Sequence, residues 1–286
     1  MLGLGFAFAL FSSASLGLTV VSIRRGVLKG SPAVATLITV LLGVPLFLIA
    51  NAVTGQLFRA AEISFLGYLA LAATGGLQMA VGRYSFYRSI QAIGGNQAEL
   101  FQALQVPLSI VIALVFLGET LSAQSAIGVS LVLAGPVLVI LAKTPPKPTA
   151  PPSTSAGAAG VGVTQPEVQM REGLLFGLVA IVSFSIGDVL ARGVLAGSGL
   201  GLFGGFVIYA AAAVALVTWV VIARRLHELR EASPARRWFL LAGVIGFLAQ
   251  MSRYVALGLA PVYVVVPLMR TVPLFVLVFS FFINRR

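Results

Sequence analysis

The stretch Ala33–Val53 has the sequence AVATLITVLLGVPLFLIANAV and carries no charged side chain along its 21 residues. An α-helix needs about 20 apolar residues to cross the roughly 30 Å hydrocarbon core of a bilayer. Within that core, a helix satisfies all of its backbone hydrogen bonds inside one segment. The stretch therefore predicts a transmembrane helix.

Eight further apolar runs of similar length lie along the chain, each bounded by charged residues, proline or glycine. They cover Gly3–Ser22, Phe65–Phe86, Gln97–Leu117, Ala123–Ala142, Gly173–Ala191, Phe203–Ile222, Trp238–Gly258 and Pro261–Ile283. Together, the runs predict an all-α membrane protein with about nine transmembrane helices. The first run is too long for a signal peptide and precedes Arg24 and Arg25 in place of a cleavage site, so we expect it to remain as a helix.

The composition excludes a water-soluble protein. Hydrophobic residues make up 59% of the 286 residues and charged residues only 9%, whereas a soluble domain carries about 25% charged residues. The formal net charge is +11, but the basic residues lie between apolar runs, so we expect no nucleic-acid partner. The chain has no cysteine, which excludes disulfides and thiolate metal sites.

Two parts of the sequence resemble each other. The first run contains SASLG at Ser13–Gly17, and the sixth contains SFSIG at Ser183–Gly187. The fourth and ninth runs each carry a Pro-Leu pair, beginning at Pro107 and Pro273, before an unbroken apolar stretch. Motifs that recur in the same order predict an internal duplication.

A segment rich in proline, alanine and glycine separates the two parts, and its composition is typical of a flexible linker. We therefore expect a first five-helix repeat at residues 1–142, a linker at 143–172 and a second repeat at 173–286. The second repeat would have four helices, because the chain stops at Arg286, where the last helix would follow. We expect that helix to be missing through truncation.

Lysine and arginine residues gather on one predicted side of the membrane. That side holds Arg24, Arg25, Lys29, Arg88, Lys143, Lys147, Arg171, Arg224, Arg225, Arg230, Arg236, Arg237, Arg285 and Arg286. The other side holds only Arg59 and Arg192. By the positive-inside rule, the first side is cytoplasmic, which predicts a multi-pass protein of the cell (plasma or inner) membrane with its amino terminus outside.

The segment Pro107–Leu121, PLSIVIALVFLGETL, together with Gly128 and Gly135–Pro136, resembles the EamA-like family of the drug/metabolite transporter superfamily. The resemblance implies ten helices in two inverted five-helix repeats, a central cavity and transport of metabolites by alternating access. The sequence departs from the family at Leu16–Gly17, where Trp-Gly is often found, and in its missing tenth helix. The family's usual orientation, with a cytoplasmic amino terminus, conflicts with the charge distribution.

Ionisable residues inside the predicted spans are candidates for a functional site, because a charge at the centre of a bilayer costs about 2.5–3.5 kcal/mol. Arg270 lies near the middle of the ninth run, between Pro267 and Pro273. Proline lacks the N–H that a helix needs, so we expect these two prolines and Pro107 to mark helix breaks beside a cavity. Arg270 would bind substrate there, or it would pair with an interior carboxylate.

The eighth run carries Gln250, Arg253 and Tyr254, whose i, i+3, i+4 spacing places them on one helix face. We expect this face to bind substrate together with Gln78 of the third run. The alternative is interhelical hydrogen bonding that only stabilises the bundle.

Two intramembrane carboxylates are candidates for proton coupling. Glu99 is predicted one to two turns inside the membrane, where desolvation favours the protonated carboxyl, and the alternative is a salt bridge to an arginine of the other repeat. Asp188 is predicted near the outer end of the sixth run, as a helix-end or gating residue or as a proton site. Arg83 and Arg88 are predicted to extend towards lipid headgroups at the cytoplasmic end of the third run.

These features predict a secondary active transporter of small metabolites, with proton-coupled export as one mode. The excess of intramembrane arginine over carboxylate favours an anionic or zwitterionic solute. An integral membrane enzyme acting on lipid would need a metal site or an activated nucleophile, and the sequence shows neither, so we expect no catalytic residue, no metal and no cofactor. A non-transporting scaffold or sensor is the other alternative. A homodimer is compatible with the pattern.

Overall fold

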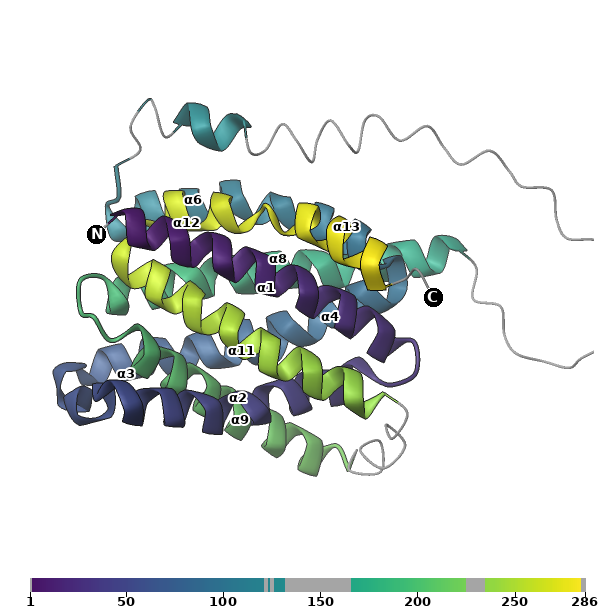
Figure 1. Ribbon diagram of the computed structural model, residues 1–286, viewed down its shortest axis with the longest axis horizontal. Helices are drawn as coiled ribbons and strands as arrows, with labels where there is room; N and C mark the ends of the chain where they lie inside the picture. The colour runs from purple at the N-terminus through teal and green to yellow at the C-terminus, as the bar shows by residue number, and fades with distance from the viewer. Residues whose placement is uncertain (1, 121–122, 124–125, 132–165, 225–234, 284–286) are drawn as a thin grey trace, which may run out of the picture.

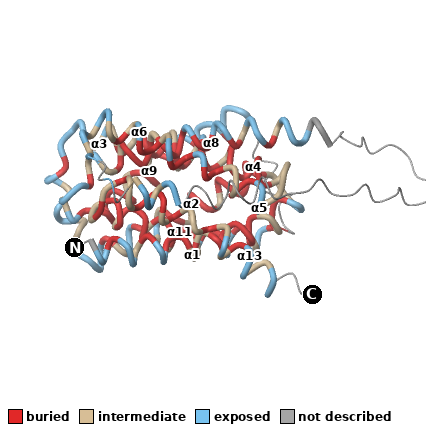
Figure 2. Tube along the Cα trace, turned by 90° about the horizontal axis from the view of Figure 1, so that it is seen from above, coloured by how far each residue is buried: buried red, intermediate tan, exposed pale blue. Residues whose placement is uncertain are grey.

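The computed structural model describes residues 2–120, 123, 126–131, 166–224 and 235–283, and within them every regular element is a helix. The elements are α1 (Leu2–Val27), α2 (Pro32–Thr54), η1 (Gln56–Glu62), α3 (Phe65–Thr74), η2 (Gly75–Gly82), α4 (Arg83–Ile93), α5 (Gly95–Phe101), η3 (Gln102–Leu104), α6 (Gln105–Leu117), α8 (Pro166–Leu195), α9 (Gly201–Ile222), α11 (Arg236–Leu259), α12 (Val262–Met269) and α13 (Val272–Ile283). The long helices lie side by side in one bundle (Figure 1), and its buried residues face the interior (Figure 2).

Eight helical segments of the described chain are long and apolar enough to cross a membrane. They are Gly3–Val27, Pro32–Thr54, Phe65–Ile93, Gly95–Leu117, Gln169–Leu195, Gly201–Ile222, Arg236–Leu259 and Val262–Phe282. The predicted all-α membrane fold is therefore confirmed. The remaining predicted helix, Ala123–Ala142, lies largely outside the described residues. The helix predicted from Gly173 begins earlier, at Pro166.

The ends of α2 show how local sequence sets the helix boundaries. The Ser31 hydroxyl accepts a hydrogen bond from the Ala33 amide at 3.2 Å, and Pro32 occupies the first helical position, where a missing N–H costs nothing. The helix ends at Gly55, which adopts a left-handed conformation with φ of 71°. Glycine reaches this conformation without the steric penalty of a side chain.

Three of the membrane-crossing segments are interrupted near their middle. A π-helix, η2, separates α3 from α4, and the short 3-10 helix η3 precedes α6. The last segment breaks between Met269 and Val272. Pro273 has no N–H to donate to the Met269 carbonyl, and the Ser13 hydroxyl of α1 donates to that carbonyl at 3.3 Å. A side chain from a distant helix thus satisfies a backbone group that the break leaves free.

The helices of the two predicted repeats pack in a matching pattern. The most extensive packing of α1 is against α11, and that of α8 is against the α3–η2–α4 segment. Each of α2 and α6 packs against its counterpart, α9 and α12 respectively. The start of α1, at Gly5, and the end of α8, at Arg192, both lie beside the connection from α11 to α12. The first helices of the two predicted repeats therefore run in opposite directions.

The crossing of α2 and α9 contains a reciprocal contact between glycine and an aromatic ring. A Cβ atom added to Gly43 would lie 2.2 Å from the Tyr209 ring, and one added to Gly205 would lie 2.4 Å from the Phe47 ring. The Phe47 and Tyr209 rings pack with their centroids 4.9 Å apart. Each helix thus presents a glycine followed, one turn later, by an aromatic ring that covers the other helix's glycine.

Gly75 and Gly76 offer a test of this close packing. A Cβ atom at Gly75 would lie 2.3 Å from the Ile208 carbonyl oxygen of α9, whereas one at Gly76 would meet nothing within 4 Å. We expect Gly75→Ala to lower stability by about 1–3 kcal/mol through overpacking. The matched control Gly76→Ala should stay within about 0.5 kcal/mol of the wild type. Thermal unfolding in detergent measures both, and equal melting temperatures would contradict the packing of η2 against α9.

Candidate functional site

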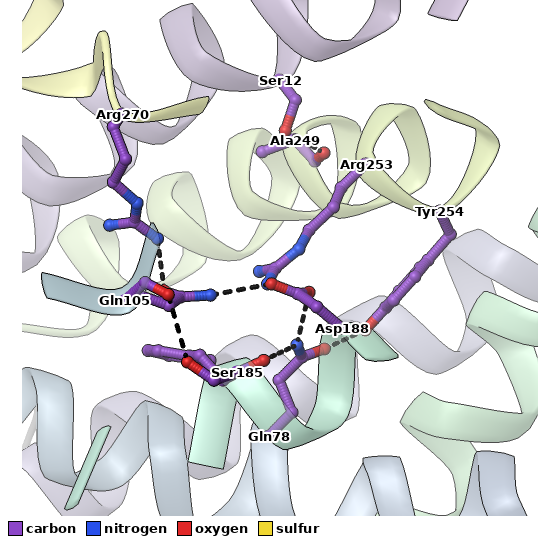
Figure 3. Close-up of polar contacts among 10 residues, drawn as sticks. Ser12, Gln78, Gln105, Ser185, Asp188, Ala249, Arg253, Tyr254 and Arg270 are labelled. Carbon is purple, nitrogen blue, oxygen red and sulfur yellow. Dashed lines mark hydrogen bonds and ion pairs between the residues drawn. The ribbon is translucent and has the colours of Figure 1, made fainter. Parts of the chain in front are cut away.

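A cluster of polar side chains lies inside the bundle, with Asp188 of α8 at its centre (Figure 3). Asp188 is fully buried, and its carboxylate accepts hydrogen bonds from Gln78 Nε2 at 3.0 Å and Gln105 Nε2 at 2.7 Å. It also pairs with Arg253, whose side chain is 5% exposed. Three other membrane segments therefore meet at one carboxylate.

Gln78 extends the cluster towards α11. Its side-chain oxygen accepts a hydrogen bond from the Tyr254 hydroxyl at 2.9 Å, while its amide nitrogen also donates to the Phe184 carbonyl at 3.3 Å. Gln78 lies in the π-helix η2, and Gly187 of α8 approaches it so closely that an added Cβ atom would lie 2.8 Å from the Gln78 Cβ. The glycine of the SFSIG motif therefore lets α8 approach η2 beside the Asp188 carboxylate.

Arg270 occupies the break between α12 and α13. Its guanidinium donates a hydrogen bond to Gln105 Oε1 and lies 4.0 Å from the Glu99 carboxylate. The side chains of Arg270 and Glu99 are 11% and 5% exposed. Arg270 Nε has no hydrogen-bond partner. Gln105 joins the Arg270–Glu99 pair to the Asp188–Arg253 pair, so the two buried ion pairs form one network.

Arg83 is buried, which makes the prediction that it extends to lipid headgroups wrong. It is 5% exposed and donates a hydrogen bond to the Tyr209 hydroxyl of α9 at 2.6 Å. Its guanidinium carbon also lies 5.1 Å from the centre of the Tyr209 ring. The phenol and its ring give the guanidinium partners inside the bundle. Arg88, in contrast, is partly exposed and pairs with Glu172 at 2.5 Å.

The predicted site residues come together to different degrees. Gln78, Asp188, Arg253, Tyr254 and Arg270 are connected in the network by hydrogen bonds, and Glu99 joins it through its ion pair with Arg270. Gln250 shares the buried face of α11, but its side-chain oxygen has no hydrogen-bond partner.

The prediction that Asp188 lies at a helix end is wrong, because α8 continues to Leu195 and the carboxylate is fully buried. Arg192, the charged residue that follows the predicted span Gly173–Ala191, lies inside α8 and does not end the helix.

Sequence reasoning missed two residues of the site. Gln105 connects the two ion pairs, and Tyr209 binds Arg83. Ser185, which belongs to the SFSIG motif, donates a hydrogen bond from its hydroxyl to the Gln105 carbonyl at 3.4 Å. Gln105 stands two residues before Pro107, which is the one signal that could have found it. Tyr209 stands in an otherwise apolar run with no neighbouring polar residue to mark it.

Contacts of Glu119 and Arg192 join α6 and α8 to the connection of α11 and α12 at one end of the bundle. Glu119 follows α6 and accepts hydrogen bonds from the Val262 amide at 3.1 and 3.3 Å, at the start of α12. Arg192 of α8 pairs with Glu119 at 3.3 Å and donates to the Leu257 carbonyl at 2.8 Å. The carboxylate satisfies an amide that the helix start leaves free. Glu119 belongs to the segment Pro107–Leu121, which resembles the EamA-like family.

Two cavities lie at opposite ends of the bundle. One of about 920 Å³ lies between α3, α6 and α8 and is largely apolar, with Glu62 and Ser64 at its edge. The other, of about 410 Å³, lies between the end of α1, the connection of α4 to α5, and α13. Neither is lined by Asp188 or Arg253, which are 0% and 4% exposed between the packed helices. Within the described part of the chain, no three His, Asp or Glu side chains approach one another as a metal site would require.

The fold and the buried network define a class: a multi-pass α-helical membrane protein that holds ionisable side chains between its helices. Residues 3–141 match the family model of the EamA-like transporter family. This match confirms the resemblance drawn from Pro107–Leu121. Over residues 3–141, the chain is therefore similar to a family of transporters. A search of curated proteins finds no match.

Proposed function

We propose that the chain is a secondary active transporter that moves small solutes by alternating access, and that the network around Asp188 binds the solute. The supporting observation is the placement of polar side chains, one of them the cation Arg270, from both halves beside interrupted helices. Arg270 lies at one break, Gln78 in the π-helix η2, and Gln105 directly after η3. Discontinuous helices in corresponding places of two repeats are typical of midplane binding sites in transporters.

We further propose two repeats at residues 1–142 and 173–286, joined by the segment 143–172, whose last seven residues, from Pro166, form the start of α8. The reciprocal contacts of Gly43 with Tyr209 and of Gly205 with Phe47 support this division, as do the opposite directions of α1 and α8. In such an arrangement, one half rocks against the other around the site. The Asp188–Gln105 hydrogen bond and the Arg270–Glu99 pair cross between the halves and would break and re-form during that motion.

The charges around the site support an anionic or zwitterionic solute. Three arginines lie there, the buried Arg83 and Arg253 and the mostly buried Arg270, against two carboxylates, Asp188 and Glu99. The hydrogen-bond partner of Arg83 is the hydroxyl of Tyr209 rather than a carboxylate. A guanidinium binds a carboxylate or phosphate group through charge-assisted hydrogen bonds, which are about twice as strong as neutral ones. A solute with a negative group would balance the surplus positive charge.

A screen of solutes on the reconstituted protein tests this function. Proteoliposomes are loaded with radiolabelled amino acids, organic acids, sugars or amines, and flux is measured with and without a pH gradient. We expect flux of at least one acidic or zwitterionic compound above that of protein-free liposomes. Folded protein that moves no solute in either direction would contradict the function and favour a scaffold or sensor.

Glu99 is the proposed proton carrier, because it is 5% exposed and its partner Arg270 lies 4.0 Å away, beyond hydrogen-bond distance. We expect Glu99→Gln to abolish flux driven by a pH gradient, since the amide cannot bind and release a proton. Exchange of labelled for unlabelled solute at equal pH separates coupling from binding. A pH-driven rate that is unchanged in Glu99→Gln would remove Glu99 from the coupling step. Glu172→Gln is the matched control, because Glu172 pairs with Arg88 outside the site.

A further inference from the structure

The cavity of about 410 Å³ lies at the Arg24 end of the bundle, between the two halves. Its lining comes from α1, from the connection of α4 to α5, and from α13. The polar lining residues are Arg24, Arg25, Asn96, Gln97 and Ser280. All of these side chains can donate hydrogen bonds, two are cations, and no carboxylate lines the cavity among the described residues.

Arg24 is fixed in position by the helix end beside it. Its Nη1 donates to the carbonyls of Ile90 at 2.8 Å and Gln91 at 3.2 Å, at the end of α4. Gly94, the residue directly after α4, has φ of 87°, and a Cβ atom there would lie 3.9 Å from the Arg24 guanidinium carbon. The glycine thus turns the chain without placing a side chain over the arginine. Guanidinium has five N–H donors, so anchoring through Nη1 leaves donors for a ligand.

Two helices lead from this cavity to the Glu99–Arg270 pair. Gln97 lines the cavity, and Glu99 follows two residues later on α5, about 3 Å further along the helix axis. On the other side, Val276 lines the cavity on α13, which begins two residues after Arg270. The Glu99–Arg270 ion pair therefore lies further inside the bundle than the cavity, between the cavity and the network around Asp188.

We propose that this cavity binds the anionic group, a carboxylate or a phosphate, of a solute that then passes to Arg270. The proposal rests on the transport function and assigns it an entry site and a solute charge. Arg24 and Arg25 attract the anion, while the uncharged side chains of Asn96 and Gln97 at the exposed mouth donate hydrogen bonds to it. A phosphate group could also come from a lipid headgroup, so the experiment separates the two sources.

The fluorescence of Trp238 can report anion binding, because the Arg25 guanidinium carbon lies 4.9 Å from the centre of the Trp238 ring. The chain has two tryptophans, so Trp219→Phe leaves Trp238 as the only one. This protein is titrated with sodium phosphate or sodium acetate at constant ionic strength, in phosphatidylcholine nanodiscs. We expect a saturable change in fluorescence that sodium chloride does not produce.

Variants in the Trp219→Phe background locate the anion. Gln97→Glu adds a negative charge at the mouth without removing a buried group, and we expect it to weaken the apparent affinity about tenfold, the effect of one lost charge-assisted hydrogen bond. Arg24→Gln should weaken it by a similar factor. The matched control is Arg236→Gln at the same end of the bundle, which is exposed, does not line the cavity and should leave the affinity unchanged.

Each outcome decides the proposal. No saturable change with phosphate or acetate, or equal affinity in Gln97→Glu and Arg236→Gln, would overturn it. A change that requires phosphatidylglycerol in the nanodisc would make the cavity a headgroup site and would overturn the entry role. Flux without a Trp238 response would refute the entry site and leave the transport function intact. A Trp238 response in a protein that transports nothing would refute the function instead.

Discussion

Arg270→Ala is expected to abolish solute flux in proteoliposomes while leaving folded protein in detergent. Arg270 donates to Gln105 and faces Glu99 at the break between α12 and α13. We expect the flux to fall about a hundredfold or more, since truncating one partner of a buried charge pair costs roughly 2–5 kcal/mol. The initial rate of uptake at a fixed amount of reconstituted protein measures the effect.

Arg88→Ala is the matched control for Arg270→Ala. Arg88 also pairs with a glutamate, Glu172, but its side chain is 36% exposed and lies outside the buried network. A partly exposed ion pair contributes about 0–1 kcal/mol, so we expect less than about a fivefold change in flux. Arg270→Lys should recover part of the rate, because it restores the charge without the planar geometry of guanidinium. Wild-type flux in Arg270→Ala would exclude this residue from the transport site.

The second large effect is expected for Asp188→Ala, which should lower the yield and melting temperature of the protein. Asp188 is fully buried and is the carboxylate paired with Arg253. Removing it leaves the Arg253 guanidinium inside the bundle without its counter-charge, and breaking a buried pair in this way costs about 3–5 kcal/mol. Size-exclusion profiles and thermal unfolding in detergent measure the loss.

A second substitution tests the physical cause of this loss. Asp188→Ala combined with Arg253→Met removes both charges, and we expect the double variant to recover part of the stability, because no unpaired charge stays buried. Ser185→Ala is the matched control on the same helix face. Ser185 is also fully buried, but it makes a single neutral hydrogen bond, worth about 1 kcal/mol. Equal melting temperatures for Asp188→Ala and Ser185→Ala would contradict the stabilising role of the Asp188–Arg253 pair.

The candidate site could be predicted in part. Gln250, Arg253 and Tyr254 follow helical spacing, and all three are buried on one face of α11. Their helix is regular from Arg236 to Leu259, so spacing alone orients them. The prediction that Arg83 extends to lipid headgroups is wrong because α4, on which it lies, begins directly after the π-helix η2. The wider turns of η2 change which side chains of α4 face the interior of the bundle. No local signal announces a π-helix, and the burial of Arg83 depends on a tyrosine 126 positions away.

Sequence alone determined that the chain crosses a membrane, and roughly where. The reason is that a bilayer imposes its requirement on each segment separately: about 20 apolar residues and an internally hydrogen-bonded backbone. Only the tertiary structure decided which ionisable residues meet. Tyr254 and Gln78 are 176 positions apart, and Gln105 and Asp188 are 83 apart. Their contacts depend on how the helices cross and rotate against one another, which is set by close approaches such as Gly187 on Gln78 and Gly43 on Tyr209.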